Sequence, residues 1–158
     1  PTKSSAELSK GSPSESINPQ TALVKIKESA GGELVRIDTV FLDYLKENGL
    51  YTDELIRKVA KNKGSVHGID EIPKDMQQVF ATAFEVKMED HLNLCSQRRK
   101  YIDNNQSLNL YFTGSDSPES IAGIHKQALL DPECNGLYYC YSMRGGNITR
   151  TTECFSCQ

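Results

Sequence analysis

The chain has 158 residues, a length that allows one domain with a sizeable core, and 37% of its residues are hydrophobic. The formal net charge of −3 at pH 7 argues against a nucleic-acid-binding protein, and no apolar run approaches the length that spans a membrane. The low apolar content fits a domain with much surface, or a piece whose core is completed by another chain. Five cysteines at unequal spacing argue against a secreted disulfide framework and favour a reducing cytoplasm.

The N-terminal stretch Pro1-Thr2-Lys3-Ser4-Ser5 precedes a short helical pattern. Hydroxyl side chains in this place are typical of a helix N-cap, and free backbone N–H groups beside a lysine are also typical of an anion site. On the residues alone, an ordinary cap at a frayed terminus is the preferred interpretation. The polar residues that follow, up to position 20, predict a loop.

Residues 22–27 and 33–37 alternate on either side of Ala30-Gly31-Gly32, which predicts a β-hairpin. A helix is expected from Phe41 to Gly49, and Thr52 is expected to cap a second one. Helical spacing then predicts a longer helix after Ile72-Pro73, with an inward stripe formed by Met76, Val79, Phe80, Ala83 and Phe84.

A further helix is predicted from about Met88 to Tyr101, with Leu92, Leu94 and Cys95 among its inner residues and His91 at the surface. A strand at 107–112, a helix opened by Ser117-Pro118 and a strand at 136–143 then form a βαβ unit, whose strands should pair in parallel. Two strands cannot complete a parallel sheet that is buried on both faces. The sequence therefore predicts that a partner sheet lies outside this chain.

Tyr138 and Tyr139 are adjacent in the last predicted strand, so they should point to opposite faces of the sheet. At least one phenol would then need a polar partner. Such a pair is common in strands and carries little weight alone.

Cys154 and Cys157 have the spacing of a redox pair, or of half a zinc site. Zinc would also need Cys134 and Cys140, whose spacing is unlike that of a zinc knuckle. A redox pair is therefore favoured, and no metal site is predicted. Paired tyrosines together with paired thiols indicate electron or radical chemistry.

Five stretches in this order resemble the C-terminal segment of the large, catalytic subunit of class I ribonucleotide reductase: 1–6, 72–75, 101–109, 136–139 and 153–157. The resemblance implies an α/β fold, in which this chain supplies the last strands and helices of a ten-stranded α/β barrel plus a small α+β insert. It would not be an autonomous domain. The implied parts are a phosphate loop and linker at 1–19, the insert at 20–90, a final barrel helix with the strand-helix-strand unit at 91–143, and a flexible redox tail at 144–158.

The resemblance also implies roles for the candidate residues. Thr2, Lys3, Ser4 and Ser5 would bind the diphosphate of a ribonucleoside diphosphate, which replaces the interpretation as a simple cap. Tyr138 and Tyr139 would relay a radical from the small subunit toward a catalytic cysteine. Cys154 and Cys157 would reduce the active-site disulfide again after turnover, and thioredoxin or glutaredoxin would then reduce them.

No stretch of this chain corresponds to the family's catalytic cysteine, to its neighbouring asparagine and glutamate, or to the two cysteines that reduce the substrate. We therefore expect a chain that is inactive alone, either an artificial fragment or, as its start favours, half of a split large subunit. It would bind no cofactor itself, and its partners would be the N-terminal portion of the large subunit and a metal-containing small subunit. The alternatives are a small thioredoxin-reducible module and a zinc-binding adaptor through Cys134, Cys140, Cys154 and Cys157.

Overall fold

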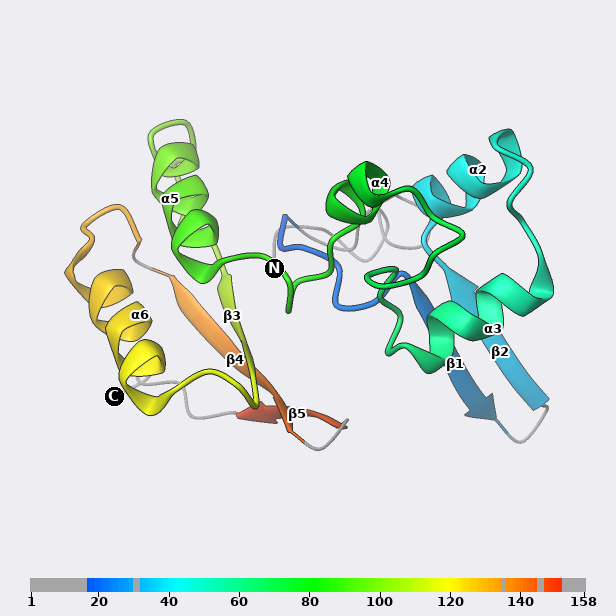
Figure 1. The fold of residues 1–158 in the computed structure, drawn as a ribbon. Coiled ribbons are helices and arrows are strands. Elements are labelled where there is room, and N and C mark those ends of the chain that lie inside the picture. The colour runs from blue at the N-terminus through cyan, green and yellow to red at the C-terminus, as the bar shows by residue number, and fades with distance from the viewer. Residues whose placement is uncertain (1–16, 30–31, 135, 145–146, 152–158) are drawn as a thin grey trace. The chain divides into compact units, whose positions relative to one another are not determined.

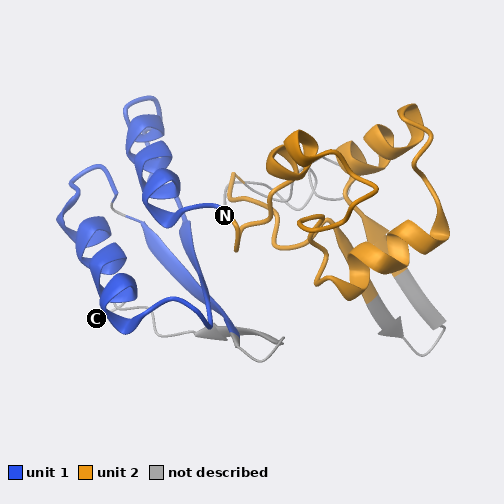
Figure 2. Cartoon of the chain, viewed as in Figure 1, with its two compact units in different colours: residues 1–2, 86–158 blue, residues 3–85 orange. Residues whose placement is uncertain are grey.

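The computed structural model describes residues 17–29, 32–134, 136–144 and 147–151. The chain forms two compact units, one of residues 3–85 and one of residues 1–2 and 86–158 (Figure 2). Among the described residues, no helix combines the length and the apolar character that crossing a membrane requires.

In its described residues, the first unit combines a β-hairpin with three helices (Figure 1). The predicted hairpin is confirmed, because its two strands pair antiparallel with Val24 opposite Ile37. The predicted cap is confirmed as well, since the Thr52 hydroxyl accepts a hydrogen bond from the Leu55 N–H at 3.1 Å. The elements are β1 (Val24–Ser29), β2 (Gly32–Ile37), α2 (Thr39–Glu47), α3 (Asp53–Lys61) and α4 (Lys74–Val79).

The core of this unit contains Phe41, which is fully buried and meets Phe80 edge to face with ring centroids 5.1 Å apart. The prediction of a longer helix after Pro73 is wrong, because α4 has only six residues and none of them is buried. Val79 is 69% exposed, whereas Phe80 and Ala83 reach the core from the chain that follows the helix. Helical spacing misled here because a coil can bring apolar residues inward at the same intervals.

The second unit contains a three-stranded sheet in the order β3-β4-β5, and α5 contacts both β3 and α6 (Figure 1). The predicted βαβ unit is confirmed, since β3 and β4 pair in parallel across α6. β5 pairs antiparallel with β4, in a segment whose polar residues did not predict a strand. The elements are α5 (Met88–Arg99), β3 (Leu108–Thr113), α6 (Pro118–Leu130), β4 (Leu137–Arg144) and β5 (Asn147–Thr151).

The inner face of α5 differs from the predicted one. Its buried residues are Met88, His91, Leu92 and Cys95, which fall on one side at helical spacing. The burial of Leu92 and Cys95 is confirmed. His91, however, is only 2% exposed instead of lying at the surface, and Leu94 is 50% exposed instead of facing inward. The helix is too polar for its apolar residues alone to indicate which side faces the sheet.

Candidate functional site

A β-bulge interrupts the pairing of β3 with β4 at the tyrosine pair. Leu108 lies opposite Leu137, but Leu110 lies opposite Cys140, so two steps along β3 correspond to three along β4. The extra residue of β4 falls in the stretch that contains Tyr138 and Tyr139. At a bulge, side chains no longer alternate strictly between the two faces of a strand.

The two phenols therefore meet. The Tyr139 hydroxyl donates a hydrogen bond to the Tyr138 hydroxyl at 2.8 Å, and the ring centroids are 3.8 Å apart with the planes inclined at 50°. The prediction that these side chains point to opposite faces is wrong, because it assumed a regular strand. The polar partner that one phenol was expected to need is the other phenol.

Asn109, in the neighbouring strand β3, contacts the bulge. Its side-chain oxygen accepts a hydrogen bond from the Tyr139 N–H at 3.3 Å, and its amide nitrogen donates to the Tyr111 hydroxyl at 3.4 Å. A bulge disrupts the regular ladder locally, and here the Asn109 side chain supplies a hydrogen-bond acceptor beside it. Sequence reasoning missed Asn109, although an asparagine between two leucines of a strand is a signal, since asparagine is depleted there.

The rings of Tyr141, Tyr111 and His91 extend the row of aromatic contacts that begins at the tyrosine pair. Tyr139 meets Tyr141 at a centroid distance of 6.1 Å, and Tyr141 stacks on Tyr111 at 5.3 Å with the planes only 7° apart. The His91 ring lies 6.3 Å from Tyr111. Burial raises the pKa of both Tyr111 and Tyr141, so these phenols keep their protons at neutral pH.

Burial and the nearby positive charge of Arg98 lower the pKa of His91, which favours its neutral form. Its Nε2 has no hydrogen-bond partner within the described part of the chain.

The other predicted site residues, namely Thr2, Lys3, Ser4, Ser5, Cys154 and Cys157, lie outside the described residues. Of the cysteines considered for zinc, Cys134 is buried, and the neighbouring Cys95 together with burial raises the pKa of its thiol. Over the described ranges, no group of three or more histidine, cysteine, aspartate or glutamate side chains could hold a metal ion.

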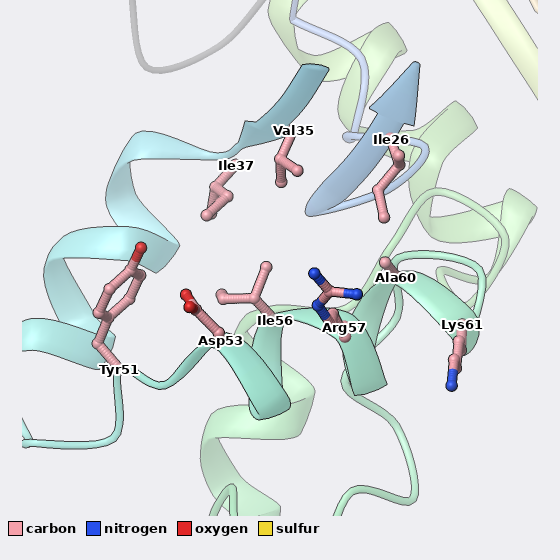
Figure 3. Close-up of a pocket in the computed structure, with 9 residues that line it drawn as sticks. All are labelled: Ile26, Val35, Ile37, Tyr51, Asp53, Ile56, Arg57, Ala60 and Lys61. Carbon is pink, nitrogen blue, oxygen red and sulfur yellow. The ribbon is translucent and has the colours of Figure 1, made fainter. Parts of the chain in front are cut away.

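The first unit contains a cavity of about 650 Å³ between the hairpin and α3 (Figure 3). Apolar side chains of the hairpin line one wall, and α3 contributes charged groups to the other. Of the described residues, none that was predicted to belong to a functional site lines it. The lining residues are Ile26, Val35, Ile37, Tyr51, Asp53, Ile56, Arg57, Ala60 and Lys61.

The described elements, with a parallel strand pair connected through a helix, define an α/β protein. The sequence model of the family described as "Ribonucleotide reductase, barrel domain" matches residues 1–139. The chain belongs to this family.

Curated relatives agree with that assignment and with the resemblance seen in the sequence. The ribonucleoside-diphosphate reductase large subunit of Caenorhabditis elegans is 30% identical over 152 residues, which cover 96% of this chain and 19% of that protein. The large subunit of Danio rerio is 27% identical over 152 residues, with the same coverage of 96% and 19%. The chain thus spans about a fifth of the length of these relatives.

Among solved structures, the alpha subunit of the Actinobacillus ureae class Id ribonucleotide reductase is similar, with a TM-score of 0.68 and 24% identity. The match covers 81% of this chain and 22% of that one. It supports the α/β fold.

Proposed function

We propose that this chain is one part of the large subunit of a ribonucleoside-diphosphate reductase. Assembled with the rest of that subunit, it would take part in the reduction of ribonucleotides to deoxyribonucleotides. The family match over residues 1–139 supports the assignment. The observation that carries the proposed role is the hydrogen bond between the hydroxyls of Tyr138 and Tyr139.

A hydrogen-bonded phenol pair suits the transfer of a radical. A neutral phenol has a pKa near 10, so its oxidation at neutral pH must release a proton together with the electron. Within the pair, the 2.8 Å bond gives that proton a direct path from the Tyr139 oxygen to the Tyr138 oxygen. An electron can pass between the same two rings, whose centroids lie 3.8 Å apart. The net result would be that the tyrosyl radical moves from one residue to the next.

The environment of the pair agrees with a relay that begins at a surface. Tyr138 is 44% exposed, whereas Tyr139 is half-buried and held through its backbone by Asn109. In the proposed reductase, a radical supplied by the metal-containing small subunit would reach Tyr138 or Tyr139. It would then pass to a catalytic cysteine in the remainder of the large subunit. This chain would bind no cofactor of its own for that step.

The remaining parts of the proposal follow from the family resemblance. Thr2, Lys3, Ser4 and Ser5 would bind the diphosphate of the substrate, for which hydroxyl and backbone N–H donors at a helix start are suited. Cys154 and Cys157 would reduce the active-site disulfide and would be reduced by thioredoxin or glutaredoxin. The described strands would complete a ten-stranded barrel together with the N-terminal portion of the subunit, in the cytoplasm.

The test uses the assembled reductase, in which this chain is combined with the rest of the large subunit and with the small subunit. Tyr138→Phe and Tyr139→Phe each remove a hydroxyl while keeping the ring, so turnover should be lost with an unchanged circular dichroism spectrum. The matched control is Tyr51→Phe, because Tyr51 has the same 44% exposure as Tyr138 but lies in the other unit. Full turnover in Tyr138→Phe and Tyr139→Phe would refute the relay.

A further inference from the structure

The proposed function leaves the cavity between the hairpin and α3 without a role. Its volume of about 650 Å³ lies within the range of about 300–1,000 Å³ that is typical of sites for small organic ligands. Such sites combine a mostly apolar lining with a few polar groups that orient the ligand. This cavity has both kinds of lining, because an apolar sheet face meets a helix that carries charged groups (Figure 3).

The hairpin supplies an apolar wall that the core of the unit covers only in part. Val24 lies opposite Ile37 in the strand pairing, and two residues further along β1 Ile26 lies opposite Val35. Side chains two positions apart share a face, so both pairs lie on the same side of the hairpin. Val24 is 3% exposed, whereas Ile26 is 41% and Val35 is 44% exposed. An apolar ligand that covered the second pair would remove this surface from water, which is favourable.

The opposite wall is a face of α3 that is apolar in its middle and carries a cation. Ile56 and Ala60 are four positions apart and Arg57 is three before Ala60, so the three side chains share one side of the helix. Figure 3 shows the guanidinium of Arg57 directed toward the hairpin strands, whereas the ammonium of Lys61 points away from them. Arg57 is therefore the cation that a molecule in the cavity would meet.

The positive charge of Arg57 is not neutralised by the described part of the chain. Over those residues, α3 forms an ion pair through Lys58, whose Nζ lies 2.7 Å from a carboxylate oxygen of Glu71, and Arg57 has no such partner. Asp53 also lines the cavity, but its carboxylate lies toward the end that Tyr51 occupies (Figure 3). An uncovered apolar wall that faces a guanidinium without a carboxylate is complementary to a ligand with an apolar body and a negative head.

We propose that this cavity is a binding site for a small amphipathic carboxylate. The apolar body of the ligand packs between Ile26 and Val35 on the hairpin and Ile56 on α3. Its carboxylate accepts two hydrogen bonds from the guanidinium of Arg57, whose planar fork of donors matches the two carboxylate oxygens. The site belongs entirely to the first unit, and it does not depend on the proposed role in ribonucleotide reduction.

The test is a titration of the full chain, as it is purified, with octanoate and with 1-octanol, followed by saturation-transfer NMR of the ligand. The two probes share the same aliphatic chain and differ in the head group, so their comparison isolates the contribution of the charge. Octanoate should bind more tightly than 1-octanol. Added sodium chloride should weaken the binding of octanoate, because salt screens a charge pair that is partly open to solvent.

Three variants assign the binding to this cavity. Arg57→Gln should weaken octanoate about fivefold, the effect of losing a charge pair near the surface, and should leave 1-octanol unchanged. Ile26→Thr keeps a β-branched residue in the strand but removes apolar contact, so both probes should bind about fourfold more weakly. The matched control is Lys74→Gln, which should bind both probes like the unmodified chain, because Lys74 is an exposed cation of α4 that does not line the cavity.

The circular dichroism spectra of the variants should match that of the unmodified chain, because each of the three side chains is exposed. The proposal is overturned if octanoate does not bind, or if Arg57→Gln and Lys74→Gln weaken its binding equally. It is also overturned if Arg57→Gln weakens 1-octanol as much as octanoate, since the loss would then come from the shape of the cavity and not from the charge.

Discussion

Replacing Gly136 with alanine should destabilise the second unit, because the backbone of Gly136 packs directly on that of Gln106. A Cβ added at this position would lie 1.7 Å from the Gln106 oxygen and 2.8 Å from its carbonyl carbon, whereas ordinary contact begins at 3.4 Å. The atoms that it meets belong to the backbone, so no side-chain rotation can make room. The two backbone segments would have to move apart by about 1.7 Å, the difference between those two distances.

That movement would also break the hydrogen bond from the Leu108 N–H to the Gly136 oxygen, which is 2.7 Å long. Overpacking of this kind costs about 1–3 kcal/mol, and the lost hydrogen bond adds about 1 kcal/mol. We therefore expect Gly136→Ala to lower the free energy of unfolding by about 2–4 kcal/mol. Because Gly136 lies just before β4, the tyrosine pair should lose its geometry as well.

The assay is urea unfolding followed by circular dichroism, carried out on the chain as it is purified. Gly123→Ala is the matched control, since Gly123 lies inside α6 and nothing lies within 4 Å of its added Cβ. Alanine should raise stability there by about 0.5–1 kcal/mol, because glycine is the poorer helix former. If Gly136→Ala unfolds at the same urea concentration as the unmodified chain, the proposed close approach of the two backbones is refuted.

Two further substitutions test the bulge and the effect of Cys134 on the pKa of Cys95. Asn109→Leu leaves the Tyr139 N–H without its side-chain acceptor and should cost about 1–3 kcal/mol in urea unfolding, whereas the same change at exposed Asn93 should stay within about 0.5 kcal/mol. Equal losses at both sites would show that Asn109 does not support the bulge. The iodoacetamide reaction of Cys95 should accelerate as the pH rises through about 7, because Cys134 and Arg98 stabilise its thiolate more than burial and Asp131 oppose it. In Cys134→Ala this midpoint should move up toward the ordinary thiol value of about 8.5, and an unchanged midpoint would contradict the effect of Cys134 on the pKa of Cys95.

Local patterns predicted those elements whose signals are contained within a few residues. The Thr52 cap, the Ser117-Pro118 helix start and the Gly-Gly hairpin each depend on neighbours at most four positions away. The parallel pairing of β3 and β4 was predictable too, because a strand-helix-strand order with short links leaves few other arrangements.

Features that depend on register were not predictable in this way. The pattern around Tyr138 and Tyr139 indicated a strand, but the bulge exists only in the pairing of β4 with β3. Because β4 has one extra residue in that pairing, the two side chains that were predicted to lie on opposite faces form a hydrogen bond instead. The burial of His91 was missed for a similar reason, since the sheet decides which face of a polar helix turns inward.

The sequence alone determined the family, through short stretches spread along the chain, and with it the chemistry that the tyrosines and thiols are proposed to carry. Only the tertiary structure decided that the two phenols share a hydrogen bond and that Asn109 supports them. The physical reason is the range of the interactions. Capping, turns and periodicity act between near neighbours in the chain, whereas these contacts join residues on separate elements or require a defect in strand pairing that no single strand specifies.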